Sequence, residues 1–211
     1  MLLAYGDLNL PTNVPANQYI LIKGEKASAS RGVGKNLNDY LDEWNPDSLR
    51  YALASILPEQ NDSEISEDEM IRRNNEELVA AWGNLVQRVF SQYINNFENL
   101  EFDFELNDVD KKIINEGNDC FEKTGELIEK VELKSSLQSV MGYVNKINAY
   151  LNETEPWKVI KEDSTRATAI LHTSLTAIEA CASLFTPFMP TTSEIVKGAI
   201  EKNTNNSWSV N

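Results

Sequence analysis

Apolar side chains recur at helical spacing over most of the chain, and the clearest run lies between residues 66 and 97. At about 100° per residue, one set falls on a single stripe that must face a core: Ile71, Leu78, Trp82, Leu85, Val89 and Tyr93. A second set flanks the stripe: Val79, Val86, Phe90 and Phe97. The pattern predicts a long amphipathic helix with Ser66 as its N-cap and Glu69 completing a capping box.

Similar periodicity predicts several other helices. They cover residues 36–44, 46–56, 107–150 with a break near 131–135, 164–184, and 193–202 with Thr192 as its cap. The alternating residues 19–22, followed by Gly24, predict a short strand and a turn. We therefore expect a mainly α protein, a helix bundle preceded by a small connector with a short strand or hairpin and helices. A polar link at residues 57–64 predicts two domains, 1–60 and 61–211.

Composition narrows the possible functions. The chain has 211 residues, of which 41% are hydrophobic and 25% charged, enough to bury a sizeable core. It contains no run of eighteen apolar residues, and its start does not resemble a signal peptide, so we expect a cytoplasmic protein that does not enter a membrane. The net charge of -14 argues against bulk attraction to phosphate, and we expect no DNA partner. Any contact with nucleic acid must use a few placed side chains.

Candidates for metal binding and catalysis are few. Cys120 and Cys181 lie far apart and no histidine cluster accompanies them, so we expect no metal site. His172, the only histidine, has no Asp, Cys or second His placed to form a triad. We interpret it as structural.

One loop could bind phosphate. The loop of residues 26–32 contains small and hydroxyl-bearing residues bracketed by Lys26 and Arg31, so backbone N–H groups, hydroxyls and cations could surround phosphate oxygens. The alternative is an ordinary serine-rich surface loop.

The same segment, GEKASASRG, is similar to the KMSKS signature loop of class I aminoacyl-tRNA synthetases. The resemblance implies that Lys26, Ser28 and Ser30 help to stabilise the pyrophosphate of ATP. Two positions depart from the family pattern: Ala27 replaces Met or Phe, and Ala29 replaces Lys or Thr. Ala29 cannot supply the second ammonium group of that loop.

Asn84 and Arg88 lie one turn apart on the polar face of the long helix. An amide and a guanidinium so placed could read two adjacent base edges of an unpaired RNA loop, and the alternative is an ordinary solvated pair. The segment RRNNEELVAAWGNLVQRV resembles the first helix of the anticodon-binding domain of methionyl-tRNA synthetases. The resemblance implies that Asn84 and Arg88 bind the anticodon.

A Pro-Trp pair interrupts the helical pattern at Trp157. This side chain could simply close the end of the bundle. The stretch AYLNETEPWKVIK resembles the methionyl family, and the resemblance implies that Trp157 stacks on an anticodon base. Since the chain doubles back here, Trp157 can lie beside the helix that carries Asn84 and Arg88.

Taken together, these resemblances imply the C-terminal part of a methionyl-tRNA synthetase. The expected partners are methionine-accepting tRNA and a catalytic domain in cis or in trans, and the complete enzyme would use ATP with Mg²⁺. The catalytic nucleotide-binding fold is not in this chain, so we expect the chain alone to bind no cofactor and to be inactive. Two alternatives are the C-terminal part of another class I synthetase and a helical adaptor for protein partners.

Overall fold

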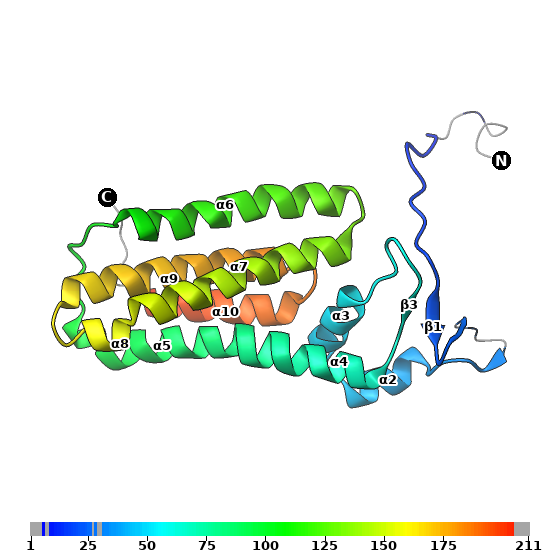
Figure 1. Ribbon diagram of the computed structural model, residues 1–211, viewed down its shortest axis with the longest axis horizontal. Helices are drawn as coiled ribbons and strands as arrows, with labels where there is room; N and C mark the ends of the chain where they lie inside the picture. Colours follow the sequence, from blue (N-terminus) through cyan, green and yellow to red (C-terminus); the bar gives the residue numbers. More distant parts are fainter. Residues whose placement is uncertain (1–5, 7–8, 27, 29–30, 205–211) are drawn as a thin grey trace.

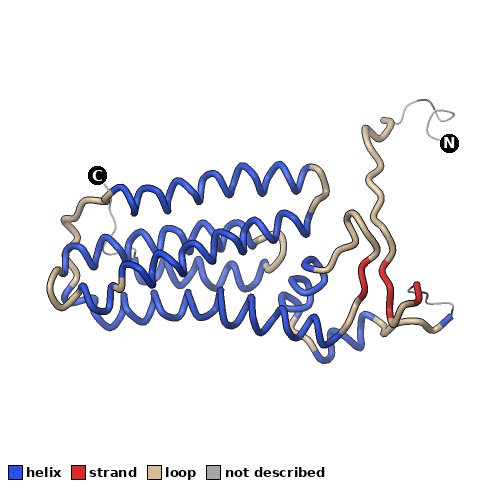
Figure 2. Tube along the Cα trace, in the orientation of Figure 1, coloured by secondary structure: helices blue, strands red, loops and turns tan. Residues whose placement is uncertain are grey.

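The computed structural model describes residues 6, 9–26, 28 and 31–204. The protein is elongated, with a helix bundle at one end and a small sheet with two short helices at the other (Figures 1 and 2). The predicted fold class, a mainly α bundle preceded by a small connector, is confirmed.

Three short strands form the sheet of the connector, in the order β2-β1-β3. They are β1 (Ile20–Ile22), β2 (Glu25–Lys26) and β3 (Ser63–Glu64). β1 and β2 are antiparallel, and the chain reverses between them at Lys23 and Gly24, which both have positive φ. The predicted strand and turn are therefore confirmed. β3 lies parallel to β1, although it comes from the segment predicted to be a polar link. The division into residues 1–60 and 61–211 stays a prediction.

One nearly continuous helix joins the connector to the far end of the bundle (Figure 1). It consists of α4 (Glu67–Arg73), a π-helical segment η2 (Asn74–Gly83) and α5 (Asn84–Asn96), followed by the 3₁₀ turn η3 (Phe97–Asn99). In a π-helix the hydrogen bonds run from residue i to i+5, so each turn holds more residues and the helix face rotates. The predicted stripe therefore holds only in part. Trp82 is buried, but Ile71 is 47% exposed and Met70 takes its place in the core.

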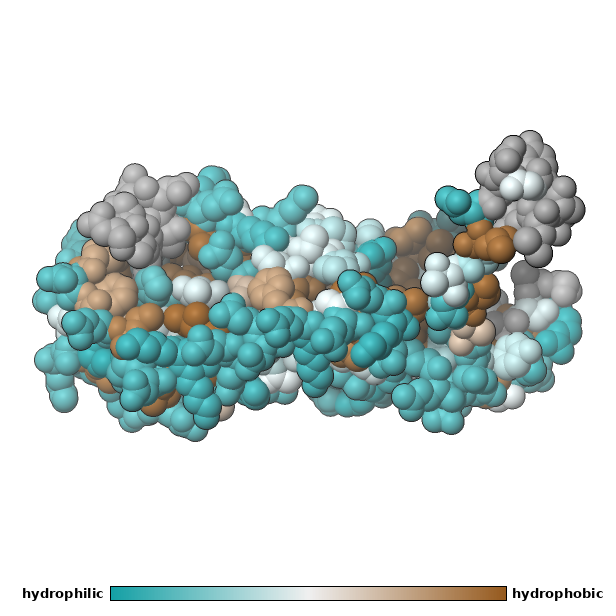
Figure 3. All heavy atoms as spheres, turned by 90° about the horizontal axis from the view of Figure 1, so that it is seen from above, coloured by the Kyte–Doolittle hydropathy of each residue, from teal (hydrophilic) through white to brown (hydrophobic). Residues whose placement is uncertain are grey.

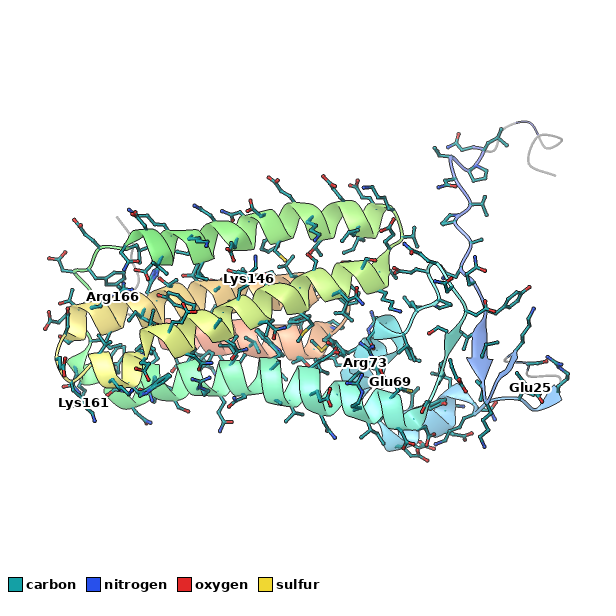
Figure 4. The ribbon with its side chains drawn as sticks, viewed as in Figure 1. Glu25, Glu69, Arg73, Lys146, Lys161 and Arg166 are labelled. Atoms are coloured by element: carbon teal, nitrogen blue, oxygen red, sulfur yellow. The ribbon has the colours of Figure 1, made fainter. Side chains whose placement is uncertain are left out.

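The long helix begins after Ser66 as predicted, but the predicted capping box is wrong. The side chain of Ser66 makes no capping hydrogen bond. Glu69 instead accepts hydrogen bonds from Arg72 at 2.8 Å and from Arg73 at 2.9 Å. The bonds from Arg72 and then Arg73 outweigh burial and lower the pKa of Glu69 to about 2. Two guanidinium groups compete successfully with a single backbone N–H for this carboxylate, and Figure 4 shows Glu69 and Arg73 together near the connector.

The bundle is completed by five further helices. They are α6 (Asp108–Glu129), α7 (Leu133–Thr154), α8 (Pro156–Val159), α9 (Ser164–Phe185) and α10 (Pro190–Thr204). α6 and α7 are separated at the predicted break, where Val131 has a φ of 62°. The prediction that α10 starts after Thr192 is wrong, because the helix already begins at Pro190, a residue suited to the first helical position.

The connector contains two helices, α2 (Leu37–Glu43) and α3 (Pro46–Ser55). Polar contacts fix α3 and the loop after it to the bundle. The buried carboxylate of Asp47 accepts a hydrogen bond from the N–H of Thr192, in the first turn of α10, at 2.6 Å. Arg50 donates to a backbone oxygen of the loop before α10 at 3.0 Å. Glu59 accepts a hydrogen bond from the hydroxyl of Ser135, at the start of α7, at 3.1 Å. These contacts tie the connector directly to three bundle segments.

Helix α9 is the central core helix. By length and composition alone it could cross a membrane, but it is mostly buried inside the protein. Its apolar side chains pack against the surrounding helices. Its apolar character is therefore used to build the core of the bundle.

An ionic cluster joins three bundle helices. Asp110 on α6 is fully buried and accepts hydrogen bonds from Tyr150 on α7 at 2.6 Å and from Arg166 on α9 at 2.9 Å. Burial acts to raise the pKa of Asp110, but the bonds from Arg166, Tyr150 and the N–H of Asn107 outweigh it and lower that pKa. Asn107 also caps α6. The carboxylate is thus ionised and held by α6, α7 and α9 together.

His172 is half-buried on α9, and its ring lies 5.2 Å from that of Phe104. Burial lowers the pKa of His172 from 6.5 to about 4, and this effect exceeds the opposing influence of Asp110. The imidazole is therefore neutral in the folded protein at neutral pH.

Acidification is therefore expected to destabilise the protein through His172. Between pH 6.5 and about 4 the unfolded chain takes up a proton that the folded protein does not, so the free energy of unfolding falls as the pH falls through this window. The slope of the free energy of unfolding against pH measures how many protons the chain takes up on unfolding. We expect His172→Gln to lower that number by up to one. Denaturant titrations across this range measure the slope, and an unchanged slope in His172→Gln would contradict the prediction.

The surface seen in Figure 3 is mostly hydrophilic, with hydrophobic side chains gathered along the bundle and near the sheet. The polar face of the long helix carries the predicted site residues Asn84 and Arg88.

Candidate nucleic-acid interface

Two of the predicted site residues meet at the far end of the bundle. The guanidinium carbon of Arg88, on α5, lies 5.2 Å from the centre of the Trp157 ring, on α8. Arg88 also donates a hydrogen bond from Nη2 to Oδ1 of Asn152, on α7, at 2.8 Å. The guanidinium group is thus held between an aromatic face and an amide oxygen, and the predicted adjacency of α5 and Trp157 is confirmed.

The path of the chain explains how Trp157 reaches α5. α7 ends where Glu155 adopts the left-handed conformation with a φ of 42°, and Pro156 then occupies the first position of α8. The chain turns sharply between the two helices as a result. Glu155 also pairs with Lys158 across this turn at 2.7 Å. Trp157 is half-buried and packs against the core, which leaves part of its ring exposed.

The third predicted residue, Asn84, is exposed at the start of α5, directly after the π-helical segment. It lies one helical turn before Arg88. Asn84 and Arg88 therefore share one face of α5, beside the α7 residue that binds the guanidinium.

Asn152 is a residue of this cluster that the sequence reasoning missed. Its signal was present in the spacing of α7, where Asn145, Asn148 and Asn152 recur at intervals of three and four residues. Asn148 donates a hydrogen bond to the carbonyl oxygen of Ala81 at 3.2 Å, so this row of amides faces η2 and α5. The spacing identifies a shared face, but only the packing shows which helix that face meets.

The serine-rich loop lies at the other end of the protein, in the connector. The ammonium group of Lys26 sits 3.5 Å from the centre of the Tyr19 ring. The N–H of Ser28 donates to the carbonyl oxygen of Val33 at 3.0 Å, and the N–H of Val33 donates to the carbonyl oxygen of Ser28 at 3.0 Å. These two hydrogen bonds close the loop. Ser30 and the alanines on either side of Ser28 lie outside the described residues. Lys26 and Ser28 are therefore not part of the cluster at Arg88.

Comparison with known families agrees with this layout. Residues 1–90 match the family described as class I (M) tRNA synthetases, and residues 103–211 match the anticodon-binding domain of methionyl-tRNA ligase.

Similar proteins include the methionine–tRNA ligase of Chloroflexus aggregans, 39% identical over 187 residues, and that of Corynebacterium glutamicum, 37% identical over 193 residues. These alignments cover 89% and 90% of the chain, which spans about a third of each relative, 31% and 32%.

A similar fold occurs in the solved structure of Mycobacterium tuberculosis methionyl-tRNA synthetase in complex with methionyl-adenylate. The TM-score is 0.77 at 21% sequence identity, and the match covers 86% of this chain and 37% of that one. At this level of identity the likeness concerns the fold. Together with the two family matches, it shows that the chain belongs to the methionyl-tRNA synthetase family and carries the anticodon-binding domain of that family.

Proposed function

We propose that this chain is the tRNA-binding part of a methionine–tRNA ligase and recognises the anticodon of methionine tRNA. The observation that carries the proposal is the cluster of Arg88, Trp157 and Asn152, which come from three helices and meet at one place on the surface. Asn84 adds an exposed amide on the same helix face as Arg88.

Each group has a role suited to an unpaired base. Trp157 offers part of an aromatic ring on which a base can stack, which contributes about 1–3 kcal/mol per base. Arg88 and Asn84 can donate to base edges, because the Watson–Crick edges of an anticodon loop are open. Asn152 holds the guanidinium of Arg88 before RNA binds, so less side-chain freedom is lost on binding.

The connector would then join this tRNA-binding end to a catalytic domain, in cis or in trans. The protein would work in the cytoplasm. ATP with Mg²⁺ is the substrate of the complete enzyme. In the described part of the loop, Lys26 supplies an ammonium group and Ser28 a hydroxyl, which suit the oxygens of a pyrophosphate. Lys26 would have to leave the ring of Tyr19 to reach them.

Binding of tRNA transcripts that differ only in the anticodon tests the proposal. We expect the chain to bind a methionine tRNA with the CAU anticodon about 5- to 150-fold more tightly than the same tRNA with its first anticodon base changed, the range for one misread base. Fluorescence anisotropy at fixed salt measures both affinities. Equal affinities for the two transcripts would overturn the proposal.

A further inference from the structure

The acidic residues of this chain are unevenly distributed. The protein contains 33 Asp and Glu residues and has a net charge of -14. None of them lies between Glu77 and Glu98, and none between Glu132 and Glu153. These two stretches contain all of α5 and most of α7, which are joined at the bond between Arg88 and Asn152. α5 and the part of α7 before Glu153 therefore carry no carboxylates, and the acidic residues that follow are Glu153, beside Asn152, and Glu155 in the turn before Trp157.

The solvent-exposed face of α5 consists of uncharged polar side chains around one cation, with Ile94 at its edge. Its buried face carries Leu85, Val89 and Tyr93. On the other side lie residues that recur at intervals of three and four and so share one face: Asn84, Gln87, Arg88, Ser91 and Asn95. All of them are exposed except the half-buried Arg88. We call these five residues the amide stripe.

We propose that the amide stripe, beyond Asn84 and Arg88, docks the sugar–phosphate backbone of the anticodon arm; this inference rests on the proposed function. Amide and hydroxyl groups donate to phosphate oxygens and exchange hydrogen bonds with ribose 2′-hydroxyls. A protein with a net charge of -14 repels a polyanion at most of its surface. A face without carboxylates is where a phosphate backbone can approach.

The chemistry of the stripe favours RNA over a protein partner. Protein interfaces depend on a few buried aromatic or large apolar anchors. Among the described residues of α5, the exposed large hydrophobic side chain is Ile94, at 54%, which follows Ser91 by three residues and lies at the edge of the stripe beside Gln87. The stripe itself offers hydrogen-bonding groups and one positive charge, which match phosphate and ribose.

Charge substitutions on the stripe provide the experiment. The double variant Ser91→Asp and Asn95→Asp places two carboxylates where the backbone would lie. We expect its affinity for the CAU tRNA to fall about tenfold, from repulsion between like charges near phosphates. The matched control is Asn115→Asp with Asn118→Asp on α6, which is also exposed and lies across the bundle from α5 (Figure 1). We expect the control to change affinity less than about twofold.

A second variant separates the effect from poor folding. Ser91→Lys with Asn95→Lys should raise the affinity for tRNA, an outcome that loss of structure cannot produce. Contacts with the sugar–phosphate backbone of the RNA carry no information on its base sequence. Both stripe variants should therefore shift the affinities for the CAU tRNA and the anticodon-altered tRNA by the same factor and leave their ratio unchanged.

Two results would overturn this inference without touching the proposed function. In the first, the α5 and α6 aspartate variants weaken binding equally, which indicates only bulk charge. In the second, the wild-type chain discriminates anticodons but the Ser91 and Asn95 variants bind as it does, so the stripe does not meet the RNA. Equal affinities of the wild-type chain for the CAU tRNA and the anticodon-altered tRNA would instead contradict the proposed function itself.

Discussion

Trp157→Ala is expected to weaken binding of the CAU-anticodon tRNA by about 5- to 150-fold, the loss of one base–aromatic stack. The substitution also removes the ring against which Arg88 rests. The guanidinium would then be held by Asn152 alone and would lose part of its fixed orientation. Unrelated tRNAs should be affected much less, because their anticodon bases do not make the full set of contacts. Fluorescence anisotropy with the two classes of tRNA measures both effects.

Two companion variants separate stacking from packing, since Trp157 is half-buried against the core. Trp157→Phe keeps an aromatic face and should retain most of the affinity for the CAU-anticodon tRNA. Trp157→Leu keeps apolar packing but no aromatic face, and should lose that affinity. Phe121→Ala removes an aromatic ring that is 42% exposed on α6 and should leave binding unchanged. If Trp157→Ala weakened all tRNAs equally, the role of Trp157 in specificity would be refuted.

Asp110→Ala is expected to lower the free energy of unfolding by about 3–5 kcal/mol. The substitution removes the buried carboxylate that joins Tyr150 and Arg166, and it leaves the guanidinium of Arg166 without its ionic partner. It also removes the acceptor for the N–H of Asn107 at the start of α6. Denaturant titration measures the change. The exposed pair Glu126 and Lys130, 3.8 Å apart on α6, supplies the control, and Glu126→Ala should cost less than about 0.5 kcal/mol.

A double variant tests whether the cost comes from an uncompensated charge. Asp110→Ala combined with Arg166→Met removes both charges and should be less destabilising than Asp110→Ala alone. Because the pKa of Asp110 is lowered in the folded protein, its contribution is present above the ordinary carboxyl pKa and is lost as the pH falls through the lowered value. The cluster should therefore add to acid unfolding at a lower pH than His172 does. Additive losses in the double variant would show that the pair acts as two separate groups.

The sequence carried enough information for the helices, the connector strand and the family. Their signals are local: the spacing of apolar residues along the helices, and the alternating residues 19–22 followed by the turn at Gly24. The π-helical segment was not predictable from spacing, because its hydrogen bonds depend on how the long helix packs. The roles of Asn84, Arg88 and Trp157 in anticodon binding remain predictions, although the structure brings Arg88 and Trp157 together.

By itself, the sequence determined that a long helix would bury one face and expose another, with Asn84 and Arg88 on the exposed one. It also determined the absence of acidic residues along α5, since composition needs no fold to be observed. Only the tertiary structure decided that Asn152 holds Arg88 and that Trp157 lies against Arg88, because these residues come from separate helices. Side-chain spacing defines the face of one helix, whereas contact between helices depends on how their faces pack around a shared core.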